Sequence, residues 1–156
     1  SIIETRLISL DAGTQLNKTT VTYDNLKEEI PIVAGIVLHE PESKAKYAIV
    51  AEKGYISYAD PTDNPDNGNG TIFVGAIVPS AKDTKAVYFE EKEKKDLRGD
   101  ADGHVLAIAD YVPNSEFVYY WGAGWSKYGF DTIEEWNTYM DKMASIKKEP
   151  LKVSIK

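Results

Sequence analysis

Residues 117–139 hold the densest cluster of aromatic side chains in the sequence and limit most strongly how the chain can fold. They include all three tryptophans and nine of the seventeen aromatic residues. Residues 117–121 combine aromatic and β-branched side chains, which predicts a β-strand. Gly122 and Gly124 then allow the backbone to turn sharply or to approach a partner closely. We expect Trp125 to follow on an irregular segment.

A helix is predicted for residues 133–146. The sequence Asp131-Thr132-Ile133-Glu134 is suited to a capping box at its start, and Pro150 ends it. The apolar residues of this helix recur at helical spacing, which predicts one buried stripe. These residues are Ile133, Trp136, Met140 and Met143.

The aromatic segment admits two interpretations. Aromatic faces beside two glycines and Lys127 are suited to the floor of a sugar-binding site. They are also suited to a plug that seats the helix on a sheet, and buried aromatic residues most often belong to cores. We assign Trp136 to the plug, next to the strand at residues 117–121, and Trp125 to the ligand face.

The composition is that of a globular chain with a single domain, residues 1–156. Its formal net charge of −7 argues against nucleic acid, whose phosphates require clustered lysine and arginine. The same charge disfavours an anionic membrane surface, and no apolar run approaches the roughly 20 residues of a membrane span. Because the chain has no cysteine, disulfides, thiol catalysis and cysteine-ligated metals are excluded.

Short apolar segments separated by turn signals occupy most of the remaining chain. Residues 32–38 are nearly all apolar, which predicts a strand buried on both faces. No helix alternates with the strands, so the predicted fold is mainly β: an antiparallel β-sandwich with one C-terminal α-helix. The predicted strands cover residues 2–10, 16–23, 32–38, 47–51, 55–59, 71–78, 85–89, 104–111, 117–121 and 151–155.

Three segments are distinctive as sequences: ISLDAGTQLNKTTVTYD (8–24), GYISYADP with GTIFVGAIV (54–78), and YYWGAGWSKYGFDTIEEW with PLKV (119–153). Together they resemble the C-terminal half of an exported domain-of-unknown-function family, number 4861, of polysaccharide-degrading gut bacteria. That family is similar to the galactose-mutarotase-like supersandwich, whose two large sheets form a sugar-facing trough. The resemblance implies a periplasmic or cell-surface protein that binds or processes an oligosaccharide or polysaccharide fragment.

The resemblance covers only one half of longer proteins, and this has two implications. The chain is expected to be part of a larger sandwich, whose open sheet edges need a partner. That partner is the N-terminal half of the same protein or a further copy of this chain. The alternative function is then a non-catalytic structural or interaction half-domain, whose active site, if any, lies in a missing N-terminal part.

The chain has two histidines, and histidine is the usual general acid or base near neutral pH. His104 opens a strand after a glycine, where sandwich sites are built, so it is the preferred catalytic candidate. His39, after an apolar strand, is the second candidate. For each histidine taken alone, a structural or exposed position is the favoured interpretation.

The strand at residues 55–59 supplies two further ligand candidates. Tyr55 and Tyr58 lie on its opposite faces, so we expect one in the core and the other available to a ligand, with Tyr58 assigned to the ligand. Asp60 at the strand end can accept sugar hydroxyls, or it can cap the following turn. The expected ligand site therefore consists of Tyr58, Asp60, Trp125 and Lys127.

The loop at residues 60–70 is dense in side-chain oxygens. Asp60, Asp63 and Asp66 offer the hard oxygen ligands that calcium prefers. The EF-hand register is not met, and the same residue types are ordinary turn formers. We therefore expect no cofactor, with calcium at this loop as the weaker alternative.

Overall fold

The computed structural model describes residues 1–62, 65–90 and 101–149. In these residues nine β-strands precede one α-helix, α2 (Ile133–Lys148). The strands are β1 (Ile3–Leu10), β2 (Leu16–Asp24), β3 (Ile30–Leu38), β4 (Lys46–Val50), β5 (Tyr55–Asp60), β6 (Ile72–Ile77), β7 (Asp83–Tyr88), β8 (Gly103–Tyr111) and β9 (Phe117–Trp125). The strand predicted for residues 151–155 lies outside the described residues.

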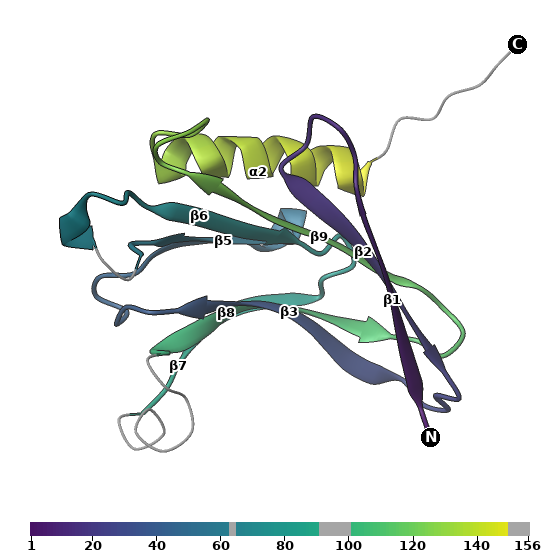
Figure 1. Ribbon diagram of the computed structural model, residues 1–156. Helices are drawn as coiled ribbons and strands as arrows, with labels where there is room; N and C mark the ends of the chain where they lie inside the picture. Colours follow the sequence, from purple (N-terminus) through teal and green to yellow (C-terminus); the bar gives the residue numbers. More distant parts are fainter. Residues whose placement is uncertain (63–64, 91–100, 150–156) are drawn as a thin grey trace, which may run out of the picture.

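The strands form two antiparallel sheets in a sandwich-like arrangement (Figure 1). The larger sheet has the order β1-β2-β9-β6-β5-β4, and the smaller sheet has the order β3-β8-β7. Figure 1 shows α2 on one side of β5 and β6 and the smaller sheet on the other. The prediction of a mainly β, antiparallel sandwich with one C-terminal helix is confirmed.

The centre of the larger sheet is buried on both faces because a different layer covers each one. Alternating residues of β5 separate into two clusters, as the two-residue period of a strand requires. Ile56 and Tyr58 pack against the smaller sheet, whereas Tyr55 and Ala59 pack under α2. The chain therefore has two core layers, and β5 contributes to both.

The smaller sheet is covered on one face only within the described part of the chain. Ala34 and Leu38 of β3 are buried against the larger sheet, whereas Val33 and Val37 are exposed on the opposite face. The prediction that this apolar strand is buried on both faces is therefore wrong for the described residues. Apolar composition alone does not say how many layers cover a sheet.

Strand β9 is longer than its sequence suggests. It continues through Gly122 and Gly124 to Trp125, so the irregular segment expected there is regular strand. Instead of forming a turn, Gly122 and Gly124 allow neighbouring groups to pack closely against β9. A Cβ at Gly122 would lie 1.9 Å from the backbone oxygen of Gln15, and one at Gly124 would lie 2.7 Å from the ring of Phe130.

Helix α2 begins at a capped end and lies flat on the larger sheet. Thr132 is the N-cap, and its hydroxyl accepts the Glu135 N–H at 3.3 Å. The carboxylate of Glu135 in turn accepts the N–H of Asp131, the residue before the N-cap, at 2.7 Å. Thr132 and Glu135 therefore close the helix start one residue later than the predicted capping box of Asp131 and Glu134. The predicted burial of Trp136 is confirmed, because Trp136 and Met140 are fully buried over Gly75 of β6. The helix packs mainly on β5 and β6, and Trp136 approaches β9 at Gly124 rather than at residues 117–121.

We predict that Trp136→Ala destabilises the fold severely. The indole is fully buried, its Nε1–H donates to the Val74 carbonyl at 3.2 Å, and its ring meets Phe130 edge-on. Truncating a buried tryptophan costs about 3–5 kcal/mol, which corresponds to a fall of roughly 10 °C in the melting temperature. Thermal unfolding followed by circular dichroism measures this loss.

Trp125→Ala is the matched control for this prediction, since Trp125 lies at the exposed end of β9. Its indole N–H donates to a loop carbonyl, so its removal should cost about 1 kcal/mol. Equal melting temperatures for the two variants would contradict the assignment of Trp136 to the plug.

A second prediction concerns the close approach at Gly122. Gly122→Ala should lower the free energy of unfolding by about 1–3 kcal/mol, because the new methyl meets the Gln15 backbone and forces the β1–β2 turn away. Gly75→Ala is the control: its methyl meets the thioether end of Met140 at 2.6 Å, which can rotate aside. Urea denaturation should rank Gly122→Ala as the more damaging change, and the reverse order would refute this.

Candidate functional site

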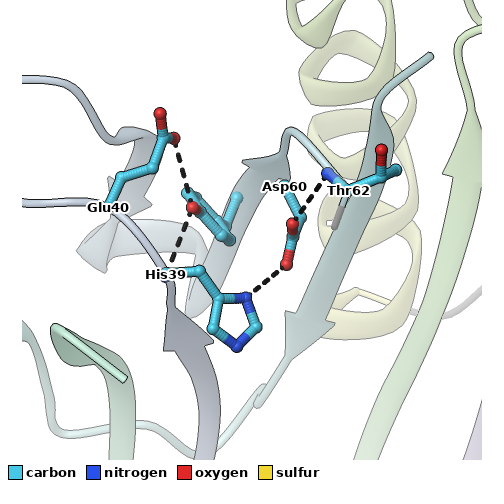
Figure 2. Close-up of polar contacts among 5 residues, drawn as sticks. His39, Glu40, Asp60 and Thr62 are labelled. Atoms are coloured by element: carbon cyan, nitrogen blue, oxygen red, sulfur yellow. Dashed lines mark hydrogen bonds and ion pairs between the residues drawn. The ribbon is translucent and has the colours of Figure 1, made fainter. Parts of the chain in front are cut away.

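His39 and Asp60 meet where two strands of different sheets end. His39 follows β3 and Asp60 is the last residue of β5. The His39 Nδ1 lies 2.7 Å from the Asp60 Oδ2. Figure 2 shows the two side chains facing one another, with the second ring nitrogen of His39 pointing away from the carboxylate. The side chains are 46% and 25% exposed, so a ligand can reach the pair.

The carboxylate of Asp60 has two roles within the chain. Its Oδ1 accepts the backbone N–H of Thr62 at 3.1 Å, so the predicted capping of the following turn is confirmed. Its Oδ2 binds His39, which fixes the imidazole ring. When Nδ1 carries the proton in this bond, Nε2 is the free base. The pair is thus arranged as an oriented acid–base group.

Tyr58 supports this pair from within the core. Its hydroxyl donates to the Glu40 carboxylate at 3.2 Å and accepts the backbone N–H of His39 at 3.4 Å, as Figure 2 illustrates. Burial raises the pKa of the Tyr58 hydroxyl well above its ordinary value, so it stays protonated. The hydroxyl therefore anchors the His39–Glu40 backbone beneath the acid–base pair.

The expectation that only one of Tyr55 and Tyr58 is buried is wrong. Both rings are buried, Tyr58 under the smaller sheet and Tyr55 under α2. Strand alternation places the two rings on opposite faces as predicted, but each face carries its own layer. A role for Tyr58 in ligand binding stays a prediction, and its buried ring leaves the hydroxyl as the group concerned.

Trp125 and Lys127 line one groove of about 520 Å³ at the end of β9. The indole of Trp125 is 42% exposed, and its Nε1–H donates to the Asn69 carbonyl at 2.8 Å. This bond fixes the ring by its edge. Tyr128, which is largely exposed, and Gln15 of the β1–β2 turn also line the groove.

The acid–base pair and the groove lie on the same face of the larger sheet. Asp60 is registered with Ile72, and Ile72 is registered with Trp125. Directly opposed residues of antiparallel strands point to the same face, and neighbouring strands are about 4.8 Å apart. The backbones of Asp60 and Trp125 are therefore about 10 Å apart in one row.

Charge adds a further feature to this groove. Lys127 is exposed beside Trp125, and among the described residues no carboxylate forms an ion pair with it. The chain as a whole carries a formal net charge of −7. An unpaired ammonium group next to an exposed indole is suited to an anionic ligand with an apolar face.

His104 is not brought together with the other predicted site residues. It lies on the outer face of the smaller sheet, registered with Val37 and Val87. Its ring contacts Phe89 edge-on, with 5.2 Å between ring centroids. The inward positions of β8 belong to its alternate residues, such as Val105. A catalytic role for His104 stays a prediction, but it would act from a different face.

In the described part of the chain, no three histidine or acidic side chains lie close enough together to hold a calcium ion. Asp60 is turned toward His39, and Asp66 is exposed on a short 3₁₀ helix (Pro65–Asn67). Asp63 lies outside the described residues.

Glu40 and Tyr128 lie at the site but are not among the residues predicted from the sequence. Glu40 follows His39 directly after an apolar strand, and this adjacency could have indicated that Glu40 belongs to the same site. The hydrogen bond between Glu40 and Tyr58 could not be predicted, because the two residues come from segments of different sheets. Tyr128 is an exposed aromatic residue next to Lys127, and only the groove distinguishes it from its aromatic neighbours.

The comparisons with known proteins bear on the family. In the described residues, no helix has both the length and the apolar character to cross a membrane. No curated protein and no solved structure matches the chain. The sequence profile of the family described as Domain of unknown function (DUF4861) matches residues 1–153. Because this match spans nearly the whole chain, the chain belongs to the DUF4861 family.

Proposed function

We propose that this chain is a carbohydrate-binding domain that holds an acidic oligosaccharide on Trp125, with the His39–Asp60 pair beside it. The observation that carries the proposal is the shared row: Asp60 and Trp125 flank Ile72 on one face of the larger sheet. A single ligand longer than one sugar ring can therefore contact both the exposed indole and the oriented histidine.

Trp125 has the properties of a stacking platform. The edge of its indole is held by the Asn69 carbonyl, which leaves the ring in one orientation. The electron-rich face of an aromatic ring attracts the C–H groups on the apolar face of a sugar. Little entropy is lost when such a pre-oriented ring binds a ligand. The groove of about 520 Å³ lies within the usual size range of ligand sites.

Lys127 favours a uronic acid over a neutral sugar. Its ammonium group is exposed at the groove and has no carboxylate partner in the described residues. A sugar carboxylate in this position gains a charge-assisted hydrogen bond. A neutral oligosaccharide gains only the stacking contact, so we expect weaker binding.

A second candidate function is processing of the bound sugar. The geometry of His39 and Asp60 favours it: the carboxylate holds Nδ1, and Nε2 is left to accept a proton from a sugar hydroxyl or ring carbon. The carboxylate then stabilises the imidazolium that forms, as in other carboxylate–histidine pairs. Export to the periplasm or cell surface, implied by the family resemblance, belongs to the same proposal.

Trp125→Ala should strongly weaken binding of a uronic-acid oligosaccharide while the protein remains folded. Loss of one stacked aromatic platform is expected to weaken affinity at least tenfold, which corresponds to about 1.4 kcal/mol. Isothermal titration calorimetry with matched uronic and neutral oligosaccharides measures it, alongside thermal unfolding of each variant.

Two variants serve as controls in this titration. Trp125→Phe keeps an aromatic face and should retain most of the affinity. Lys127→Gln should bring the affinity for the uronic oligosaccharide down to that for the neutral one. Unchanged affinity in Trp125→Ala, or no binding by the unmodified protein, would overturn the proposed function.

The two histidine variants separate processing from binding. His39→Gln should abolish turnover of a uronic oligosaccharide without loss of binding, because the proton acceptor is removed while the platform remains. His104→Gln is the matched control and should keep full activity, since His104 lies on the outer face of the other sheet. Chromatographic analysis of the products measures turnover. Loss of activity in His104→Gln alone would show that the pair at Asp60 is not the reacting group.

A further inference from the structure

Strand β1 is a sheet edge without the usual protection. Among the residues that the structure describes, it is the outermost strand of the larger sheet and pairs with β2 on one side only. The pairing is unbroken from Ile3 to Leu10, and every residue of the strand is exposed. Natural edges are usually shortened, bulged or marked by proline or charged side chains. β1 is long and unbulged and has no proline, and its two charged residues, Glu4 and Arg6, are opposite in sign and pair with one another. Its outward backbone groups are therefore a template for another strand.

The sequence of this edge complements itself. Residues 2–8 read Ile-Ile-Glu-Thr-Arg-Leu-Ile. In an antiparallel pair of two copies centred on Thr5, apolar residues oppose apolar residues and the acid opposes the base. The opposed residues are Ile2 with Ile8, Ile3 with Leu7, Glu4 with Arg6, and Thr5 with Thr5.

The charged residues favour the register centred on Thr5 over registers shifted by one residue. Glu4 and Arg6 lie on the same face of β1 and bind one another within the strand. A second copy centred on Thr5 would add two further opposite-charge contacts across the interface. Centring the pair on Glu4 or on Arg6 instead would oppose like charges, which is destabilising in antiparallel strands.

The exposed apolar side chains favour the same partner. Ile3 and Leu7 project from one face of β1, and Ile8 projects from the other; each is more than half exposed. Pairing about Thr5 places Ile3 next to Leu7 and Ile2 next to Ile8 of the second copy, so each side chain loses part of its contact with water. An exposed apolar edge of this kind marks an interaction site.

We propose that β1 is a dimerisation edge, at which two copies of this chain pair antiparallel through residues 2–8 about a two-fold axis at Thr5. The two larger sheets then form one continuous sheet. The interface is isologous, since the same surface serves both partners. A single strand pair is a small interface, so we expect a reversible dimer whose population depends on protein concentration.

Charge reversal followed by mixing tests the proposal. Glu4→Lys opposes cations to cations in a homodimer, and Arg6→Glu opposes anions to anions. Each variant alone should have a dimer dissociation constant raised about tenfold or more. In an equimolar mixture of the two variants, the introduced lysine faces the introduced glutamate, and the retained Arg6 faces the retained Glu4. Every charge then opposes its opposite, so a heterodimer should form. Analytical ultracentrifugation over a range of concentrations measures all three samples.

Two helix variants control for changes in overall charge. Glu134→Lys and Lys142→Glu alter exposed residues of α2 and should leave the dimer unchanged. Circular dichroism confirms that each variant is folded. The proposal fails if the unmodified chain stays monomeric at high concentration, which would mean that something other than a second copy covers this edge. It also fails if either single variant dimerises normally, or if the mixture does not associate.

Discussion

The packing of α2 on β5 and β6 is the contact on which the rest of the structure depends. Met140 lies directly over Gly75, and Phe130 and Trp136 lie directly over Gly124, so a Cβ at either glycine would require these side chains to move. This packing buries the second face of a sheet whose first face already carries the smaller sheet. The helix also holds the β1–β2 turn, because the Tyr139 hydroxyl accepts the backbone N–H of Gln15 at 3.0 Å.

The site follows from this arrangement. Two-sided cover makes β5 and β6 rigid, and β9 is paired with β6 along its length, so a row across their ends has a fixed geometry. Asp60 and Trp125 occupy that row with Ile72 between them. The loop after Asp60 returns to bond with Trp125 through Asn69, and the Thr71 N–H donates to the Ser126 hydroxyl at 2.8 Å. The acid–base pair and the indole are thus connected through both the sheet and the loop.

The sequence predicted elements whose patterns are local. The helix stripe with Trp136, the cap at Thr132 and the turn role of Asp60 rest on residues close in sequence, and the structure contains them. Features that depend on the number of layers could not be predicted. The sequence of an apolar strand such as β3 is the same whether one face of its sheet is covered or both. Strand alternation placed Tyr58 on the correct face, but it could not show that a second sheet buries that face. The His39–Asp60 contact joins two sheets and has no signature in the sequence.

The proposed dimer edge and the candidate ligand groove use different ends of one hairpin. The pairing centred on Thr5 involves residues 2–8, whereas the groove is lined by Gln15 in the turn that follows β1. Leu10 and the turn therefore lie beyond the pairing region. Because Tyr139 anchors Thr14 and Gln15 to α2, the turn does not depend on a second copy for its position. A dimer joined at β1 would therefore leave both grooves open, so two candidate ligand grooves can be carried on one continuous sheet.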